Sequence, residues 1–240
     1  MVEKVDILAV GAHPDDVELS AGGVVAKHVS AGKKVAIVDL TEGELGSRGT
    51  VQSRYKEAEN ASEILGVSHR VNIKLADGFF EEDRDSLVKL IAQIRHFQPE
   101  IVLANAPNDR HPDHGRGASF IARACFLSGL LKIVTEKDGQ QQQHWRPKAV
   151  YHYIQDYYLQ PDFVIDVSDF VDQKFKAIRA YETQFYNPKI DGPKTPISGK
   201  EFFDFLESRM LQYGRTINVK YAEGFIVTRT LGVDSFFDLI

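Results

Sequence analysis

The 240-residue sequence contains a single cysteine, Cys125, and only one tryptophan and two methionines. A lone cysteine excludes an intramolecular disulfide and is typical of a reducing compartment, so we expect the chain to act in the cytoplasm. Because Cys125 lies within an apolar stretch, we interpret it as a buried helix residue rather than as a reactive thiol.

Long apolar runs and basic clusters are also missing. No stretch approaches the roughly 18 to 20 apolar residues that a membrane-spanning helix needs, and the charged first residues do not resemble a signal peptide. The formal net charge is -5, which argues against a surface that neutralises nucleic-acid phosphates. The sequence therefore predicts neither a membrane partner nor a nucleic-acid partner.

The first half of the chain instead alternates short apolar runs with helical patterns. The predicted strands are residues 5–10, 34–40, 71–75 and 101–104, and the predicted helices are residues 17–30, 52–65, 84–97 and 113–128. This alternation is typical of βαβ units. We therefore expect an α/β fold with a Rossmann-like, mostly parallel sheet and helices on both of its faces.

The second half is less regular, but no repeat or long linker divides it from the regular core at 1–130, so we expect residues 1–240 to form a single domain. Residues 137–144 are predicted as an exposed loop, and 186–199 as a long loop that is a candidate lid. The remaining predicted elements are strands at 149–154, 163–167 and 224–230 and helices at 168–185 and 201–214.

Two clusters of histidine and aspartate follow predicted strands. His13, Asp15 and Asp16 come directly after the first strand, and His111-Pro112-Asp113-His114 follows the fourth. Because ligands bind beyond the C-terminal ends of strands in open α/β sheets, the two clusters are expected to converge. Imidazole and carboxylate groups are normal zinc ligands, and three of them leave a position for water. We therefore predict a metal-dependent hydrolase with His13, Asp16 and His114 as ligands. In the alternative interpretation, Asp15 and Asp16 only cap a helix and His13 is a turn residue.

The remaining polar residues of these clusters have candidate catalytic roles. Asp15 is expected to act as a general base, or else to cap a helix or anchor a histidine ligand. His111 can stabilise an oxyanion or protonate a leaving amine. Asp113 can orient His111 and keep it protonated, or it can be the partner of a metal-bound histidine.

A glycine-rich loop at residues 41–49 follows the second predicted strand. It lacks the ending of a phosphate-binding Walker loop, but its glycines allow close approach of backbone to a ligand. We predict that Glu44, Ser47 or Arg48 contacts a polar substrate. Arg54 either pairs with Glu57 on its own helix or holds Asp15 or a substrate carboxylate.

Taken together, these motifs resemble the LmbE/PIG-L family of metal-dependent N-acetylglucosamine deacetylases. The matching segments, in the order found in the family, are AHPDD at 12–16 followed by Gly22-Gly23, TEGELGSRG at 41–49, RYKEA at 54–58 and HPDH at 111–114. The resemblance implies one Zn²⁺ per chain, or Fe²⁺, on the ligands named above. It further implies that Asp15 is the general base, that His111 paired with Asp113 assists it, and that Arg54 orients Asp15 or contacts substrate.

In chain length and in residues 162–185, the sequence resembles the branch of the family that deacetylates N-acetylglucosaminyl-malate in bacillithiol synthesis. This resemblance implies N-acetylglucosaminyl-malate as the substrate. It also implies a homo-oligomer, which we expect to be a hexamer. Related mycothiol-pathway enzymes carry a tyrosine before HPDH, whereas this chain has Asn108-Asp109-Arg110. We hypothesise that Arg110 faces the malate carboxylates. The alternatives are a deacetylase of chitooligosaccharides or of an antibiotic precursor, a zinc phosphoesterase and a non-catalytic metal-binding scaffold.

Overall fold

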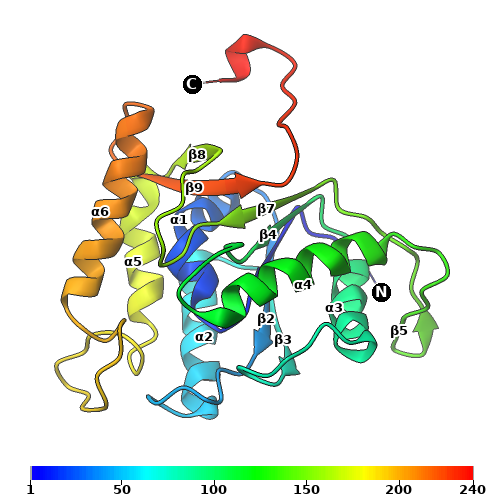
Figure 1. The fold of residues 1–240 in the computed structure, drawn as a ribbon, viewed down its shortest axis with the longest axis horizontal. Coiled ribbons are helices and arrows are strands. Elements are labelled where there is room, and N and C mark those ends of the chain that lie inside the picture. The colour runs from blue at the N-terminus through cyan, green and yellow to red at the C-terminus, as the bar shows by residue number, and fades with distance from the viewer. Residues whose placement is uncertain (1, 240) are drawn as a thin grey trace.

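Seven strands form one twisted sheet in the computed structural model, which describes residues 2–239 (Figure 1). The strands are β1 (Ile7–Gly11), β2 (Val35–Thr41), β3 (His69–Leu75), β4 (Ile101–Ala104), β7 (Ala149–Tyr153), β8 (Phe163–Asp166) and β9 (Ala222–Val227). The helices are α1 (Asp16–Ser30), α2 (Val51–Leu65), α3 (Arg84–Phe97), α4 (Pro112–Ser128), α5 (Val171–Arg179) and α6 (Glu201–Thr216).

The strand order is β3-β2-β1-β4-β7-β9-β8, with β1 at the point where the chain changes direction across the sheet. The first five strands in this order are parallel, whereas β9 runs antiparallel to both β7 and β8. The mostly parallel α/β sheet predicted from the sequence is confirmed. Its C-terminal edge next to β1 is the place where such sheets bind ligands.

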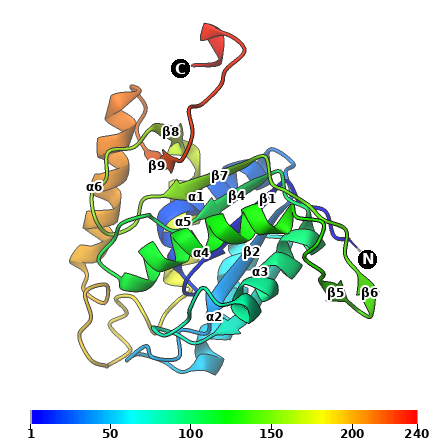
Figure 2. The same cartoon turned by 45° about the vertical axis from the view of Figure 1, so that its right-hand side comes forward.

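Both faces of the sheet are covered by helices, because alternate side chains of β1 are apolar on each side. Ile7 and Ala9 pack into a core that contains residues of α1, α2 and α5, while Leu8 and Val10 pack into a second core with α3 and α4. Figure 2 shows α3 and α4 on the opposite side of the sheet from α1 and α5. None of the helices within residues 2–239 combines the length and the apolar character that a bilayer crossing requires.

Two segments differ from the sequence prediction. The helix expected at 168–185 is a 3-10 turn (Ser168–Phe170) followed by α5, which ends at Arg179, because the Thr183 amide and hydroxyl donate to Glu57 instead of to helical carbonyls. The loop expected at 137–144 begins with a small hairpin of β5 (Glu136–Lys137) and β6 (Gln140–Gln141), with φ of 54° and 73° at its Asp138-Gly139 turn.

A buried ion pair of the second half of the chain is also hydrogen-bonded to the first half. Lys174 on α5 lies 2.6 Å from Glu223 on β9, and each side chain is only 2% exposed. The carboxylate of Glu223 also accepts hydrogen bonds from the backbone amides of Gly23 and Val24 in α1. One charge pair therefore links α1, α5 and β9, and loss of the cation would leave a buried carboxylate uncompensated.

Replacement of this lysine is expected to destabilise the fold. Lys174→Met should lower the free energy of unfolding by roughly 3 to 5 kcal/mol, whereas adding Glu223→Gln should recover part of the loss by removing the stranded charge. Lys56→Met is the matched control, because Lys56 forms an exposed pair with Glu59 and should change stability by less than about 1 kcal/mol. Denaturant unfolding measures all three; equal, small losses for both lysines would contradict the expectation.

Candidate metal centre and active site

A cavity of about 260 Å³ opens at the C-terminal edge of the parallel strands. The loops after β1, β2, β3, β4 and β7 all contribute to its lining, and the opposite wall comes from residues 184–209, including part of α6. Both histidine clusters predicted from the sequence lie in this cavity. The sheet edge therefore brings together side chains that are about one hundred residues apart in the chain.

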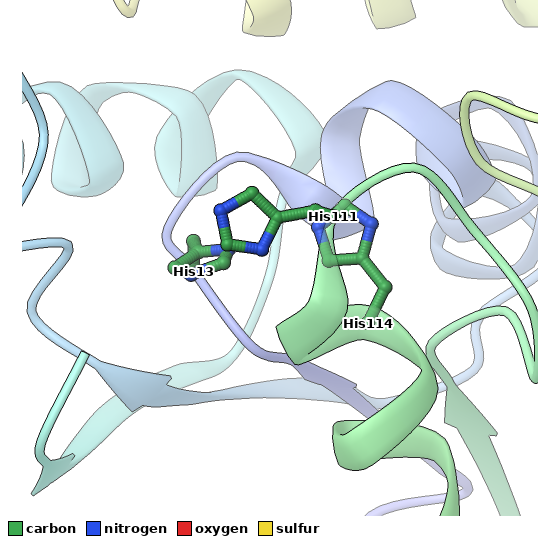
Figure 3. A group of neighbouring side chains, drawn as sticks. All are labelled: His13, His111 and His114. Atoms are coloured by element: carbon green, nitrogen blue, oxygen red, sulfur yellow. The ribbon is translucent and has the colours of Figure 1, made fainter. Parts of the chain in front are cut away.

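Asp16 lies between two histidines at the base of this cavity. Its Oδ1 is 3.1 Å from Nε2 of His114, and its Oδ2 is 3.8 Å from Nδ1 of His13. His13 comes from the loop after β1, while His111 and His114 come from the start of α4 (Figure 3). The three residues that the sequence predicts as metal ligands are thus adjacent. Asp16 and His114 are buried, and the side chain of His13 is 12% exposed.

Each of the two histidines contacts a further carboxylate with its other nitrogen. Nε2 of His13 lies 3.1 Å from Asp77 and 3.3 Å from Asp113, and Nδ1 of His114 lies 2.5 Å from Asp109. Carboxylates placed in this way fix the tautomer and the orientation of metal-binding histidines. The inward nitrogens, Nδ1 of His13 and Nε2 of His114, consequently both face Asp16.

Amide side chains hold Asp16 itself in place. Asn105 donates to its Oδ2 and Gln155 donates to its Oδ1, at 2.9 and 3.0 Å. Gln155 also lies 3.2 Å from Nε2 of His114, so it contacts two of the predicted ligands at once. The carboxylate therefore has a defined orientation before any ligand arrives.

The charges of this cluster shift the pKa values of its members strongly. Burial favours neutral His13, but hydrogen bonds to Asp113 and Asp77 outweigh it and raise the pKa of His13 to about 10. Against the same effect of burial, the charge of Asp16 raises the pKa of His114 to about 9, and both histidines hold the pKa of Asp16 well below its usual range. The buried carboxylates of the cluster are therefore stable only with positive charge beside them. Either protons on the histidines or a bound metal ion can supply this charge.

The donor chemistry fits a divalent transition metal. One ring nitrogen from each of His13, His111 and His114 lies within 4.8 Å of the others, and Asp16 contacts two of these rings. Two imidazoles and a carboxylate form a normal catalytic ligand set. His111 is the additional nitrogen that the structure brings within reach, and His13 with Asp77 and Asp113 is a second group of similar compactness.

Asp15 lies beside this group and is held by Arg54. Nη2 of Arg54 donates to the carbonyl of Pro14 at 2.6 Å and to Asp15 at 3.3 Å. Burial raises the pKa of Asp15 to about 7, with Arg54 opposing the shift. Asp15 also adopts φ 119°, a conformation that only glycine adopts readily, so the surrounding contacts hold its backbone under strain. Of the two pairings expected for Arg54, the structure has the one with Asp15, because the carboxylate of Glu57 accepts hydrogen bonds from Thr183 instead.

The carboxylate of Asp113 contacts His13 rather than His111, unlike the pairing expected from the sequence. Nδ1 of His111 is oriented instead by the backbone amide of Asp113, which donates to it at 3.3 Å because His111 caps α4. Burial and the neighbouring charges of His13 and His114 lower the pKa of His111. His111 is therefore neutral near pH 7, and Asp113 takes the alternative position beside a predicted metal ligand.

The loop at 41–49 reaches the cavity mainly through Gly43, Leu45 and Gly46. Glu44 accepts a hydrogen bond from the Asp77 amide, and Arg48 donates to the carbonyls of Thr183, Ile190 and Pro193, while Ser47 is exposed. Glu44 and Arg48 thus support neighbouring loops in this structure.

Arg110 lines the cavity, and its Nε pairs with Asp156. Neither this partner nor several other polar residues of the site were predicted from the sequence. The residues not predicted are Asp77, Asn105, Gln155, Asp156 and Arg209, along with the role of Asp109 beside His114. All but Arg209 follow strands closely, which is the signal that could have found them.

Comparison with known proteins places this site in a family. The sequence profile described as PIG-L, GlcNAc-PI de-N-acetylase, matches residues 8–125. The conserved protein TT1542 from Thermus thermophilus is 32% identical, with a TM-score of 0.85 over 96% of this chain and 98% of that chain.

Two curated relatives differ in the reaction that their names describe. Diacetylchitobiose deacetylase of Thermococcus kodakarensis is 29% identical over 91% of this chain and 81% of that protein. The 4-oxalmesaconate hydratase of Pseudomonas putida is also 29% identical, over 74% of this chain and 73% of that protein. Both names describe reactions in which water is a reactant.

The arrangement predicts how metal binding responds to substitution. His114→Ala should abolish binding of one Zn²⁺ per chain, and Asp109→Asn should weaken it roughly 10- to 100-fold by releasing the His114 ring. His111→Ala should retain the metal if Asp16 completes the ligand set. Asp204→Asn, an exposed change on α6, is the control. Competition with a chromophoric chelator measures each affinity; loss of the metal in His111→Ala would instead indicate a three-histidine site.

Proposed function

The chain belongs to the PIG-L family of de-N-acetylases, and on that premise we propose that it hydrolyses the acetamide of an N-acetylglucosamine conjugate. The observation that carries the proposal is the position of Asp15. Its buried carboxyl, with a pKa raised to about 7 by burial, lies next to the His13, Asp16 and His114 group in the same cavity. A base tuned to neutral pH beside a metal-binding group is the arrangement that amide hydrolysis requires.

We propose zinc as the metal, one ion per chain, with Fe²⁺ as the alternative that the same ligands accept. His13, Asp16 and His114 would hold it. When bound, such an ion acidifies water and polarises an acyl carbonyl. Asp77, Asp109 and Asp113 keep the two histidines oriented for this task, as the contacts described above indicate.

Asp15 is assigned the proton transfers. Its carboxylate accepts a proton from the attacking water, and Arg54 holds the carboxylate toward the cavity through the contact to Asp15 and the carbonyl of Pro14. The protonated acid then returns the proton to the leaving amine. His111 is less suited to this second step, because its lowered pKa leaves it without an extra proton near pH 7. Acetate and a free glucosamine conjugate are the products.

His111 is assigned the role of stabilising the oxyanion that forms during attack on the acetamide. Since its Nδ1 accepts the backbone amide of Asp113, the neutral ring carries its hydrogen on Nε2. This N–H is a donor from a ring that lines the cavity. A donor aimed at the developing oxygen charge typically contributes roughly 3 kcal/mol to the rate.

We further propose N-acetylglucosaminyl-malate as the substrate, which would place the protein in bacillithiol synthesis. Arg110, which the sequence hypothesis assigns to the malate carboxylates, lines the cavity, and its positive charge supports an anionic substrate. Glu44, Ser47 and Arg48 stay predicted substrate contacts, with Gly43 and Gly46 nearest the cavity. A chitooligosaccharide or an antibiotic precursor is the alternative.

The same proposal includes a cytoplasmic homo-oligomer, expected as a hexamer. The buried, unreactive setting of Cys125, whose thiol pKa burial raises to about 12, fits a reducing compartment. Near the C-terminus, Phe236 and Phe237 are 89% and 96% exposed, and adjacent exposed aromatic rings are typical of contact surfaces. These two rings are the surface that supports self-association.

Replacing Asp15 should separate catalysis from metal binding. Asp15→Asn preserves size and is expected to reduce kcat by at least roughly 100-fold, because the base is lost while His13, Asp16 and His114 are unchanged. Metal content, measured by atomic emission, should stay near one ion per chain. If the variant loses its metal instead, Asp15 is a ligand and the assigned roles are wrong.

The reaction itself is tested with matched substrates. The zinc-loaded protein should release one acetate and one primary amine from each N-acetylglucosaminyl-malate, at a kcat/KM well above that for free N-acetylglucosamine. Amine derivatisation and an acetate assay measure the two products independently. Equal rates on both compounds would reject the malate conjugate, and no acetate from any N-acetylated sugar would reject deacetylation and direct attention to hydration of an unsaturated acid.

A further inference from the structure

Arg209 on α6 is a cavity residue that none of the assigned roles uses. Its side chain lines the same cavity as the metal-binding group, together with Phe202, Phe205 and Leu206 of the same helix. The guanidinium lies over the ring of Phe205, 5.1 Å from the ring centre. Stacking on an aromatic face leaves the edge of a guanidinium, which carries all of its N–H donors, available to another group.

The donors of Arg209 have no partner within residues 2–239. Nη1 is buried from solvent and makes no hydrogen bond, and no ion pair or side-chain hydrogen bond of Arg209 is found in this part of the chain. Burial lowers the pKa of Arg209, yet an arginine remains charged at any physiological pH. A buried charged donor without an acceptor is unfavourable, so such a group in a cavity points to an acceptor supplied by a ligand.

The other two arginines of the cavity are already engaged. Arg54 donates to Asp15 and to the carbonyl of Pro14, although its Nε is unpartnered. Arg110 pairs through Nε with Asp156, which also lines the cavity and neutralises it. Arg209 therefore differs from the other two arginines of the cavity: within residues 2–239, no carboxylate forms an ion pair with it.

We propose that Arg209 is the specificity-determining residue that binds a carboxylate on the group attached to the glucosamine, in preference to Arg110. The inference rests on the proposed function for the identity of the sugar. It orients the substrate: the acetamide lies toward His13, Asp15 and His111, and the carboxylate-bearing substituent lies toward α6. Phe205 holds the guanidinium plane so that its free edge can pair bidentately with the carboxylate.

The proposal separates acidic conjugates from neutral ones. A neutral disaccharide would leave the guanidinium of Arg209 without a charged acceptor, whereas a hydroxy-acid conjugate supplies one through the donors that are not buried. The selectivity should appear in KM rather than in kcat, because the contact is remote from the acetamide and is made equally in ground and transition states.

The experiment compares N-acetylglucosaminyl-malate with its dimethyl ester, which has the same shape and no charge. Arg209→Met should raise KM for the acid roughly 10- to 100-fold, in line with the strength of a charged hydrogen bond, while changing KM for the ester far less. Arg209→Lys should restore part of the preference. Arg215→Met, at an exposed position later on α6, is the matched control, and Arg110→Met tests the competing residue.

A second readout keeps the result independent of turnover. Calorimetric titration of L-malate, with neutral dimethyl malate as the reference, into the metal-free protein should show binding that Arg209→Met removes and Arg215→Met retains. The assignment would be overturned if the wild type did not bind malate. It would also be overturned if Arg209→Met raised KM equally for the acid and the ester, or if only Arg110→Met lost the preference for the acid. Inactivity of the wild type on all N-acetylated sugars, with malate binding still dependent on Arg209, would reject only the proposed reaction. Unchanged thermal unfolding of each variant excludes a folding defect.

Discussion

The carboxylate of Asp16, held between two buried histidines, is the interaction on which the organisation of the cavity depends. Asn105 and Gln155 fix its two oxygens, and it faces the inward nitrogens of His13 and His114. So many buried carboxylates in one place are tolerable only with cations among them. A metal ion meets this requirement and at the same time supplies the chemistry that the neighbouring Asp15 can exploit.

The sheet topology explains why this cluster can form at all. Parallel strands direct all of their C-terminal ends to one edge, so the loops after β1, β3, β4 and β7 each deliver one part of the cluster. Helix α2 adds Arg54, which contacts Asp15, the proposed base. The chemistry thus comes from the βαβ core, whereas α6 faces it from the second half and adds the apolar rings and Arg209.

The regular elements and the grouping of the candidate metal ligands could be predicted from the sequence because they depend on local patterns. Apolar runs bounded by glycine located the parallel strands, and the position of the two histidine motifs after strands brought His13, Asp16 and His114 together. The partner of Asp113 could not be predicted, because the choice between His13 and His111 depends on how α4 is capped. The end of α5 likewise depends on Glu57, which is more than one hundred residues away in the chain.

Arg209 illustrates a second limit. Within a helix rich in charged residues it has no sequence signal that separates it from Arg215, and only the packing of α6 against the cavity partly buries Arg209 and exposes Arg215. The same packing places Phe205 under its guanidinium. The position of the proposed selectivity residue therefore depends on long-range packing, whereas the histidine and aspartate motifs can be recognised from the local sequence.

The most direct test of the account is to locate the metal by anomalous X-ray diffraction from crystals of the zinc-loaded protein. We expect one peak per chain at roughly 2.0 to 2.2 Å from Nδ1 of His13, Nε2 of His114 and an oxygen of Asp16, the usual lengths of such bonds. Asp77, Asp109 and Asp113 should remain on the outer nitrogens. A peak held by Asp77 and Asp113, or coordination by His111 in place of Asp16, would contradict the account.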